Sequence, residues 1–258
     1  IENGKSKKVT EKTVEKFAKT LEIEFEELVT HCSEQQNKPG NLETNLGDAP
    51  YNIKEASEED LRWIVNCHKK VYSEDDCIPF EKMLEWYNKN EIGFNKIVDN
   101  SERICGNLNI LPLNDECLDR FLQGKILEKD ILESDLVNDE DVVNNLYVES
   151  FVCIDNQGAF NNLAAYQTLM LADLILKRFN LGENVKIYAI SANQIATQLL
   201  ESLSFTRIVE GNVRLDSHAM FYIDYDTVIK KLLWMSNEER KPVFQNILDK
   251  LNVEADNL

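Results

Sequence analysis

The chain has 258 residues, enough for one large domain or two modest ones. Hydrophobic residues make up 43% of it and charged residues 29%, which excludes a wholly disordered protein. Acidic residues outnumber lysine and arginine by 46 to 28, and the resulting net charge of −18 repels nucleic acid, anionic lipid and anionic cofactors at long range.

Neither a membrane segment nor a disulfide framework is expected. No apolar run approaches about 18 residues, and charges occupy the place of a signal peptide's apolar region. The missing initial Met suggests a fragment. The six cysteines form no CxxC pair, which favours a reduced, cytoplasmic protein. The pairs His31-Cys32 and Cys67-His68 are too close in sequence for shared metal ligation, so we expect no metal, buried thiols and partly exposed imidazoles.

A short helical head comes first, over residues 1–32. Apolar residues recur at helical spacing from Val14 to Leu21, and a second stripe begins at Phe25. Residues 1–20 hold six lysines against three glutamates, so this head is basic while the remainder is acidic. Residues 33–50, SEQQNKPGNLETNLGDAP, lack apolar periodicity and are expected to form a linker.

The body begins with a strand at 51–55 and a helix at 57–72, opened by a capping box from Ser57 to Asp60. The pattern then predicts, in order, a helix at 79–90, a hairpin of 92–98 and 103–111, and an acidic, partly helical insertion at 114–144.

The second half predicts a strand at 145–154 and a long helix at 160–179 ended by Gly182. It continues with a strand at 185–190, a helix at 193–203, strands at 205–209 and 219–224, and helices at 225–234 and 236–251. This order predicts an α/β fold with a mixed, mainly antiparallel sheet flanked by helices, after a small all-helical N-terminal segment. We expect the main domain at 51–225 and a helical extension at 226–258.

The segment YVESFVCID, the long helix after it and ANQIATQLLESLSF resemble the GNAT family of acyl-CoA-dependent N-acyltransferases over residues 51–225. The resemblance implies that the strand binds pantetheine and that the following helix receives the pyrophosphate at its N-terminus. The implied cofactor-binding residues are Val152, Cys153, Ile154, Asn161, Asn162, Ala164, Ala165 and Asn193.

The expected pyrophosphate turn departs from the family's glycine-rich pattern. It reads NQGAFNNLAA, so Gly158 stands too early and asparagines replace the glycines. Asn161 and Asn162 tolerate positive φ better than most residues. No Lys or Arg occurs between Lys129 and Lys177, a stretch with nine acids, so an anion would depend on backbone dipoles or on distant cations such as Arg207 or Arg214. Acetyl-CoA is the implied donor, and these features weigh against tight binding.

Glu149 is the candidate general base, because the resemblance places it in the family's relation to Cys153 on the same strand. Alternation predicts that Tyr147, Glu149, Phe151 and Cys153 share one side, where apolar neighbours would raise the pKa of the carboxyl. The alternative is an ordinary strand glutamate, paired or solvated.

The general acid of the family is missing, because its Tyr position holds Leu200, which has no proton to donate. Tyr188 on the neighbouring strand is the candidate substitute, with Tyr166 a second choice. Core packing is the ordinary role of such tyrosines.

The head, IENGKSKKVTEKTVEKFAKTLEIEFEELV, resembles the C-terminal half of an Xre-type helix-turn-helix. In an intact parent the resemblance implies contacts with the DNA backbone from Asn3, Lys5, Lys7 and Lys8. The first two helices would be absent here, so we expect DNA binding through the complete domain rather than by this chain. The alternative is an amphipathic helix pair with a solvated lysine face.

Two functions follow as hypotheses. The first is a degenerate GNAT-like module of a transcriptional regulator, sensing a ligand or partner with weak or no catalysis. The second is an active acetyl-CoA-dependent N-acetyltransferase that modifies a small amine or a protein amine. The C-terminal helices could serve a homodimer.

Overall fold

The computed structural model describes residues 51–138 and 140–236. The expected head at 1–32, the linker at 33–50 and the helix at 236–251 lie outside this range, except for Ser236 itself. Within the described part, no helix combines the length and apolarity needed to cross a bilayer.

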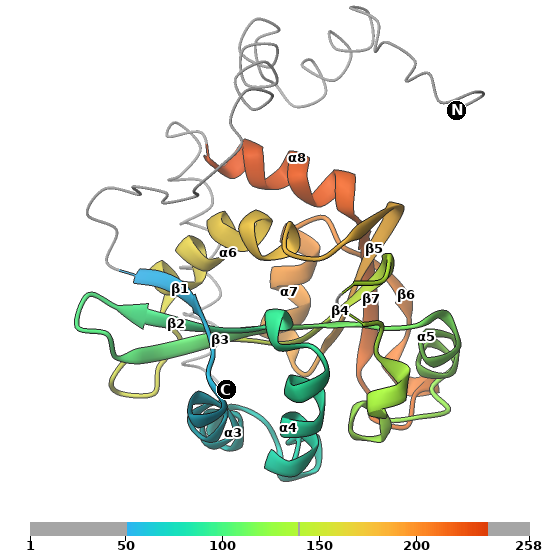
Figure 1. Ribbon diagram of the computed structural model, residues 1–258, viewed down its shortest axis with the longest axis horizontal. Helices are drawn as coiled ribbons and strands as arrows, with labels where there is room; N and C mark the ends of the chain where they lie inside the picture. The colour runs from blue at the N-terminus through green and yellow to red at the C-terminus, as the bar shows by residue number, and fades with distance from the viewer. Residues whose placement is uncertain (1–50, 139, 237–258) are drawn as a thin grey trace, which may run out of the picture. The chain divides into compact units, whose positions relative to one another are not determined.

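Seven strands form one sheet (Figure 1). Their bounds are β1 Tyr51–Glu55, β2 Phe94–Asp99, β3 Ile104–Pro112, β4 Val143–Cys153, β5 Leu181–Ser191, β6 Thr206–Val209 and β7 Ala219–Asp224. The helices are α3 Glu58–Val71, α4 Phe80–Lys89, α5 Asp115–Leu122, α6 Asn162–Leu176, α7 Gln194–Ser202 and α8 Tyr225–Ser236. The expected mixed, mainly antiparallel sheet with flanking helices is confirmed.

The strand order is β1-β2-β3-β4-β5-β7-β6, and every neighbouring pair is antiparallel except β4 with β5. The parallel pairing of β4 and β5 ends at Val148 and Ala189. Both strands continue past this point, β4 to Cys153 and β5 to Ser191. The two central strands therefore part in the middle of the sheet, and a gap opens between their C-terminal ends.

Helices cover both faces of the sheet (Figure 1). On one, here called the α3 face, the core joins residues of α3, α4 and α5 to Tyr147 and Tyr188 of the central strands. On the other, the α6 face, α6 and α8 pack on Leu108, Leu146 and Ile187. Strand alternation distributes apolar side chains to both faces, so each layer of helices buries its own core.

Asparagine side chains cap the N-termini of α6 and α7, the two helices that begin near the gap. The side chain of Asn161 accepts the N–H of Ala164 at 3.0 Å, and that of Asn193 accepts the N–H of Ala196 at 2.9 Å. Asparagine is a preferred residue at this position because it satisfies an N–H that the helix itself leaves without a partner. Both α6 and α7 thus begin beside the gap.

The expected end of the long helix at Gly182 is wrong. Helix α6 ends at Leu176 and Gly182 is the second residue of β5, where an added Cβ would lie 2.1 Å from the side-chain oxygen of Asn144. This glycine permits close approach of the neighbouring strand rather than a helix cap.

Candidate functional site

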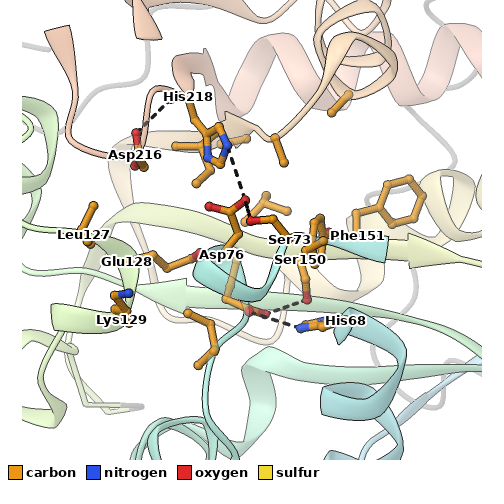
Figure 2. Close-up of a pocket in the computed structure, with 18 of the residues that line it drawn as sticks. His68, Ser73, Asp76, Leu127, Glu128, Lys129, Ser150, Phe151, Asp216 and His218 are labelled. Atoms are coloured by element: carbon orange, nitrogen blue, oxygen red, sulfur yellow. Dashed lines mark hydrogen bonds and ion pairs between the residues drawn. The ribbon is translucent and has the colours of Figure 1, made fainter. Parts of the chain in front are cut away.

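A cavity of about 510 Å³ lies at the point where β4 and β5 part (Figure 2). Its walls come from the two strands, from α3 and the segment that follows it, from residues 127–129, from α7 and from the loop before β7. Figure 2 shows His68, Asp76 and His218, which are far apart in sequence, around this one space. The topology therefore gathers polar groups from five parts of the chain beside the open ends of the central strands.

Glu149 lies in this cavity at an irregularity of β4. Asn109 of β3 pairs with Ser150, and the next residue, Ile110, pairs with Val148, so Glu149 is an extra residue in its strand. Such a bulge places two consecutive side chains opposite one residue of the partner strand. The carboxylate of Glu149 consequently lies beside the hydroxyl of Ser150, which donates to it at 2.6 Å.

The bulge also changes the direction of every side chain after it. Tyr147 packs in the core of the α3 face, whereas Phe151 and Cys153 pack with Ala164 and Ala165 on the α6 face. The prediction that Tyr147, Glu149, Phe151 and Cys153 share one side is therefore wrong, because regular alternation does not hold through an inserted residue.

The neighbours of the Glu149 carboxylate are polar rather than apolar as expected. The amide of Asn109 donates to Oε2 at 2.9 Å, and Nδ1 of His68 lies 3.9 Å from Oε1. Asn107 in turn donates to the hydroxyl of Ser150 at 2.6 Å. The side chain of Glu149 is only 2% exposed, so a hydrogen-bonded network inside the protein holds the carboxylate in one orientation.

His68 is 1% exposed, which corrects the expectation of partly exposed imidazoles. Burial lowers the pKa of His68, against the opposing effect of the Glu149 charge. Its Nε2 is buried and has no hydrogen-bond partner among the described residues. A neutral imidazole beside a carboxylate can accept or relay a proton.

A second carboxylate, Glu128, faces the same cavity from the insertion. Burial raises the pKa of Glu128 well above its ordinary value, and the charge of Glu149 adds to the shift. The hydroxyl of Tyr147 donates to Glu128 at 2.7 Å. Two carboxyl groups in one poorly solvated space favour a state in which one is protonated, here Glu128.

The lining of the cavity is acidic. Five residues contribute carboxyl groups: Asp75, Asp76, Glu128, Glu149 and Asp216. The basic side chains in the lining are those of Lys129 and two histidines. Asp216 is neutralised by the buried Arg214, which binds it through two nitrogens at 3.0 and 2.5 Å. Nε2 of His218 lies 3.7 Å from Asp76 across the mouth (Figure 2). The remaining negative charge favours a cationic ligand.

The residues proposed for cofactor binding lie around the same gap. Cys153 is fully buried beside Thr168, burial raises the pKa of its thiol, and its carbonyl accepts the N–H of Asn161. Val152 is buried, and Ile154 bonds through its N–H to Cys105. Asn193 begins α7. Val152, Cys153 and Ile154 follow the part of β4 along which the described structure has no strand on the β5 side, and none of the residues proposed for cofactor binding lines the cavity with Glu149.

At the start of α6, some of the backbone N–H groups that could bind an anion already have partners within the protein. The N–H of Ala164 is taken by the Asn161 side chain and that of Ala165 by the Asn161 carbonyl. Asn161 has φ of −97°, and the positive φ in this loop is at Gly158. The N–H of Leu163 has no acceptor one turn earlier within the helix, so it can still point toward an anion.

Cations that are distant in sequence approach this helix start. Lys70 and Arg103 line a cavity of about 290 Å³ together with Asn161, although Asp99 binds Arg103 through its side chain at 2.6 Å. By contrast, Arg207 pairs with Glu201 and Glu210, and Arg214 is buried against Asp216. Lys70 is therefore a better placed cation than either arginine considered from the sequence.

Tyr188 and Leu200 differ in their relation to the cavity. Tyr188 is buried in the core of the α3 face beside Tyr222, burial raises its pKa, and it does not line the cavity that contains Glu149. Leu200 does line it. Among the described residues, no group of three or more His, Cys, Asp or Glu is arranged to hold a metal ion.

Sequence reasoning missed His68, Glu128 and the two asparagines of β3. The asparagines carry a signal, because Asn107 and Asn109 alternate with apolar residues in CGNLNILP and so must face one side of a buried strand. The sequence predicts His68 to be a partly exposed imidazole, because nothing in it shows that α3 brings this residue to β4. Glu128 has no signal, since it lies in an acidic insertion whose path the sequence does not specify.

Comparison with known proteins gives no sequence match, either to a family model or to a curated protein. Solved structures do match. Ard1 from Thermoplasma volcanium is 12% identical, with a TM-score of 0.46 over 68% of this chain and 97% of its own. The loading GNATL domain of CurA from Lyngbya majuscula is 14% identical, with a TM-score of 0.46 over 67% and 97%. Mutant forms of the spermidine/spermine N-acetyltransferase SpeG from Vibrio cholerae are 14% identical, with a TM-score of 0.40 over 70% and 98%.

Proposed function

We propose that the described domain transfers an acyl group from an acyl-CoA thioester to a cationic amine, with Glu149 as the general base. The observation that carries this proposal is the carboxylate of Glu149, held by Asn109 and Ser150 in a cavity at the gap between β4 and β5. An amine nitrogen that enters this cavity can give its proton to a fixed, desolvated acceptor at the place where the strands leave room for a thioester.

The proposed acyl transfer proceeds in three steps. Glu149 takes one proton from the cationic amine, and the freed nitrogen lone pair attacks the thioester carbonyl. A C–N bond replaces the C–S bond, and the nitrogen releases its second proton to solvent. The sulfur leaves as a thiolate, and solvent supplies its proton because Leu200 cannot. A thiol with a pKa near 8.5 is an acceptable leaving group without acid catalysis.

Two parts of the protein support the fit of coenzyme A, one for its pantetheine and one for its phosphates. Between the strands, the open edge of β4 offers backbone groups to pantetheine, and at the start of α6 the Leu163 N–H and Lys70 can face phosphate. In the proposed mechanism, the chain binds and orients the thioester along the open edge of β4 while the amine approaches from the acidic cavity.

The test is release of free thiol from acyl-CoA in the presence of diamines and monoamines. Glu149→Gln should lower kcat by about 10²- to 10⁴-fold with little change in KM, because only the proton acceptor is removed. Glu85→Gln, at an exposed glutamate of α4, is the matched control and should retain activity. Unchanged turnover in Glu149→Gln would remove the assigned base.

A ligand-sensing module is the second candidate, favoured by the use of the Ala164 N–H as a cap by the Asn161 side chain and by Leu200 at the acid position. Calorimetry separates the two: saturable acyl-CoA binding without thiol release supports sensing. The resemblance of residues 1–32 to a helix-turn-helix, with Asn3, Lys5, Lys7 and Lys8 near phosphates in an intact parent domain, supports the proposal that either activity belongs to a regulator. We expect DNA binding by this chain alone to be weak and salt-sensitive, so a sequence-specific gel shift at moderate salt would contradict this expectation.

A further inference from the structure

A third cavity, of about 110 Å³, lies on the α6 face behind the gap. Its floor comes from β3, β4 and β5, and its walls come from α6, α7 and α8. The surface is entirely apolar, and Lys231 contributes only its stem. A polar ligand would lose its hydrogen bonds to water here without replacement, so the chemistry of the site suits a hydrocarbon.

This cavity and the one that contains Glu149 meet at the gap between the strands. They share the side chains of five residues, from β4, β5 and α7: Val148, Phe151, Ala189, Leu199 and Leu200. Ala189 belongs to the last pair of the parallel ladder, where a larger side chain would fill the space between the two cavities. A group attached to a carbonyl near Glu149 can therefore extend past these shared side chains toward the part of the apolar cavity that α8 lines.

The volume sets the length of that group. An engineered apolar cavity of about 150 Å³ accommodates the six carbons of benzene, so this cavity has room for about four carbon groups such as methylenes. An acetyl group would leave this space empty, and an apolar space of this kind gains nothing from water.

We propose that the preferred acyl group is a short linear chain of about six carbons, whose tail occupies the apolar cavity. This inference rests on the proposed acyl transfer and deepens it by naming the class of donor. Each methylene transferred from water to the cavity contributes about 0.8 kcal/mol, which corresponds to about a fourfold gain per methylene.

The first experiment needs no variant. The kcat/KM of the whole chain is measured with acetyl-, butyryl-, hexanoyl- and decanoyl-CoA at a fixed saturating diamine concentration. We expect a rise to about 200-fold over acetyl at hexanoyl, from four methylenes at about fourfold each, and a fall at decanoyl. A hexanoyl advantage of tenfold or more supports the proposal, and a smaller or reversed ratio overturns it.

The second experiment fills the cavity from α6. Ala172→Phe should reduce the hexanoyl advantage to less than threefold while acetyl transfer stays within about threefold of wild type, because Ala172 lines the apolar cavity and not the one with Glu149. Leu174→Phe adds the same ring to a half-buried position of the same helix outside both linings and should keep the advantage. An unchanged chain-length profile in a folded Ala172→Phe protein overturns the proposal.

The proposed acyl transfer and the proposed chain-length preference are contradicted by different results. If no acyl-CoA of any length releases thiol or binds, the proposed function fails and the inference fails with it. If acetyl-CoA is used as well as hexanoyl-CoA, acyl transfer stands and only the place of the tail is overturned.

Discussion

The imidazole of His68 is buried, which disfavours a positive charge on it, and this makes the protein sensitive to mild acid. Because the pKa of His68 is lowered in the folded state, the unfolded chain binds this proton at a higher pH, near 6.5. Stability contributed by the neutral imidazole is therefore present above about pH 6.5 and is lost as the pH falls below it.

Replacement of His68 should reveal this dependence. Between pH 7.5 and 5.5, wild type should lose up to about 1.4 kcal/mol more than His68→Gln, which is about 3–5 °C in Tm. Glu128 titrates in both proteins, so the comparison isolates the histidine. Thermal melts followed by circular dichroism give the answer, and equal losses in both proteins would contradict a buried neutral His68.

Leu200 offers a gain-of-function prediction. Its side chain lines the cavity with Glu149, so a hydroxyl there can reach a departing thiolate. Leu200→Tyr should raise kcat at least tenfold, since general acid catalysis contributes about 10² to 10⁴. Leu200→Phe introduces the ring without the hydroxyl and serves as the control. Equal rates for the two variants would show that a missing acid does not limit the reaction.

At the scale of elements, the junction of β3 and β4 fixes the position of the strand that carries Glu149. A Cβ added at Gly106 would lie 2.2 Å from the carbonyl oxygen of Val152, so the two backbones approach too closely for any side chain. Gly158 differs: its φ is +84°, but open space surrounds it.

These two glycines make a matched pair. Gly106→Ala should cost about 2 kcal/mol or more because β4 must move away from β3, whereas Gly158→Ala should cost about 1 kcal/mol through φ alone. Urea titration measures both costs. If Gly106→Ala proved no more costly than Gly158→Ala, β4 could shift freely, and the geometry around Glu149 would not depend on this contact.

The order and type of the described elements were predictable from apolar spacing and capping residues, such as Ser57 before α3 and Asn193 before α7. Glu149 could be selected from the resemblance, but its surroundings could not. The bulge depends on the register of β4 against β3, which leaves no mark in a single sequence, and the inserted residue turns Phe151 and Cys153 to the other face. Gly182 was misread because a helix cap and a close strand contact both require glycine.

For the molecule as a whole, the net charge of −18 acts oppositely on the two proposed substrates. An anionic thioester approaches against a repulsive field, and a cationic amine approaches with an attractive one. Raising the ionic strength from 0.01 to 0.15 M shortens the screening length from about 30 to about 8 Å.

We therefore expect the KM for acyl-CoA to fall and the KM for a diamine to rise over this range of salt, each by about two- to fivefold. A neutral diol of the same length as the diamine, used as a competitive inhibitor, is the control and should show a constant inhibition constant. Parallel changes in both KM values would contradict steering by the overall charge.

The reversal of side-chain direction along β4 also has a kinetic consequence. Cys153, the cysteine nearest in sequence to Glu149, is sealed against Ala164 and Ala165, so no acyl-cysteine can form there before the acceptor arrives. In the proposed reaction, donor and acceptor enter from opposite sides of one strand and can be present together without displacing each other. Double-reciprocal plots of initial velocity should thus intersect rather than run parallel, and protein exposed to the donor alone should retain no covalent label.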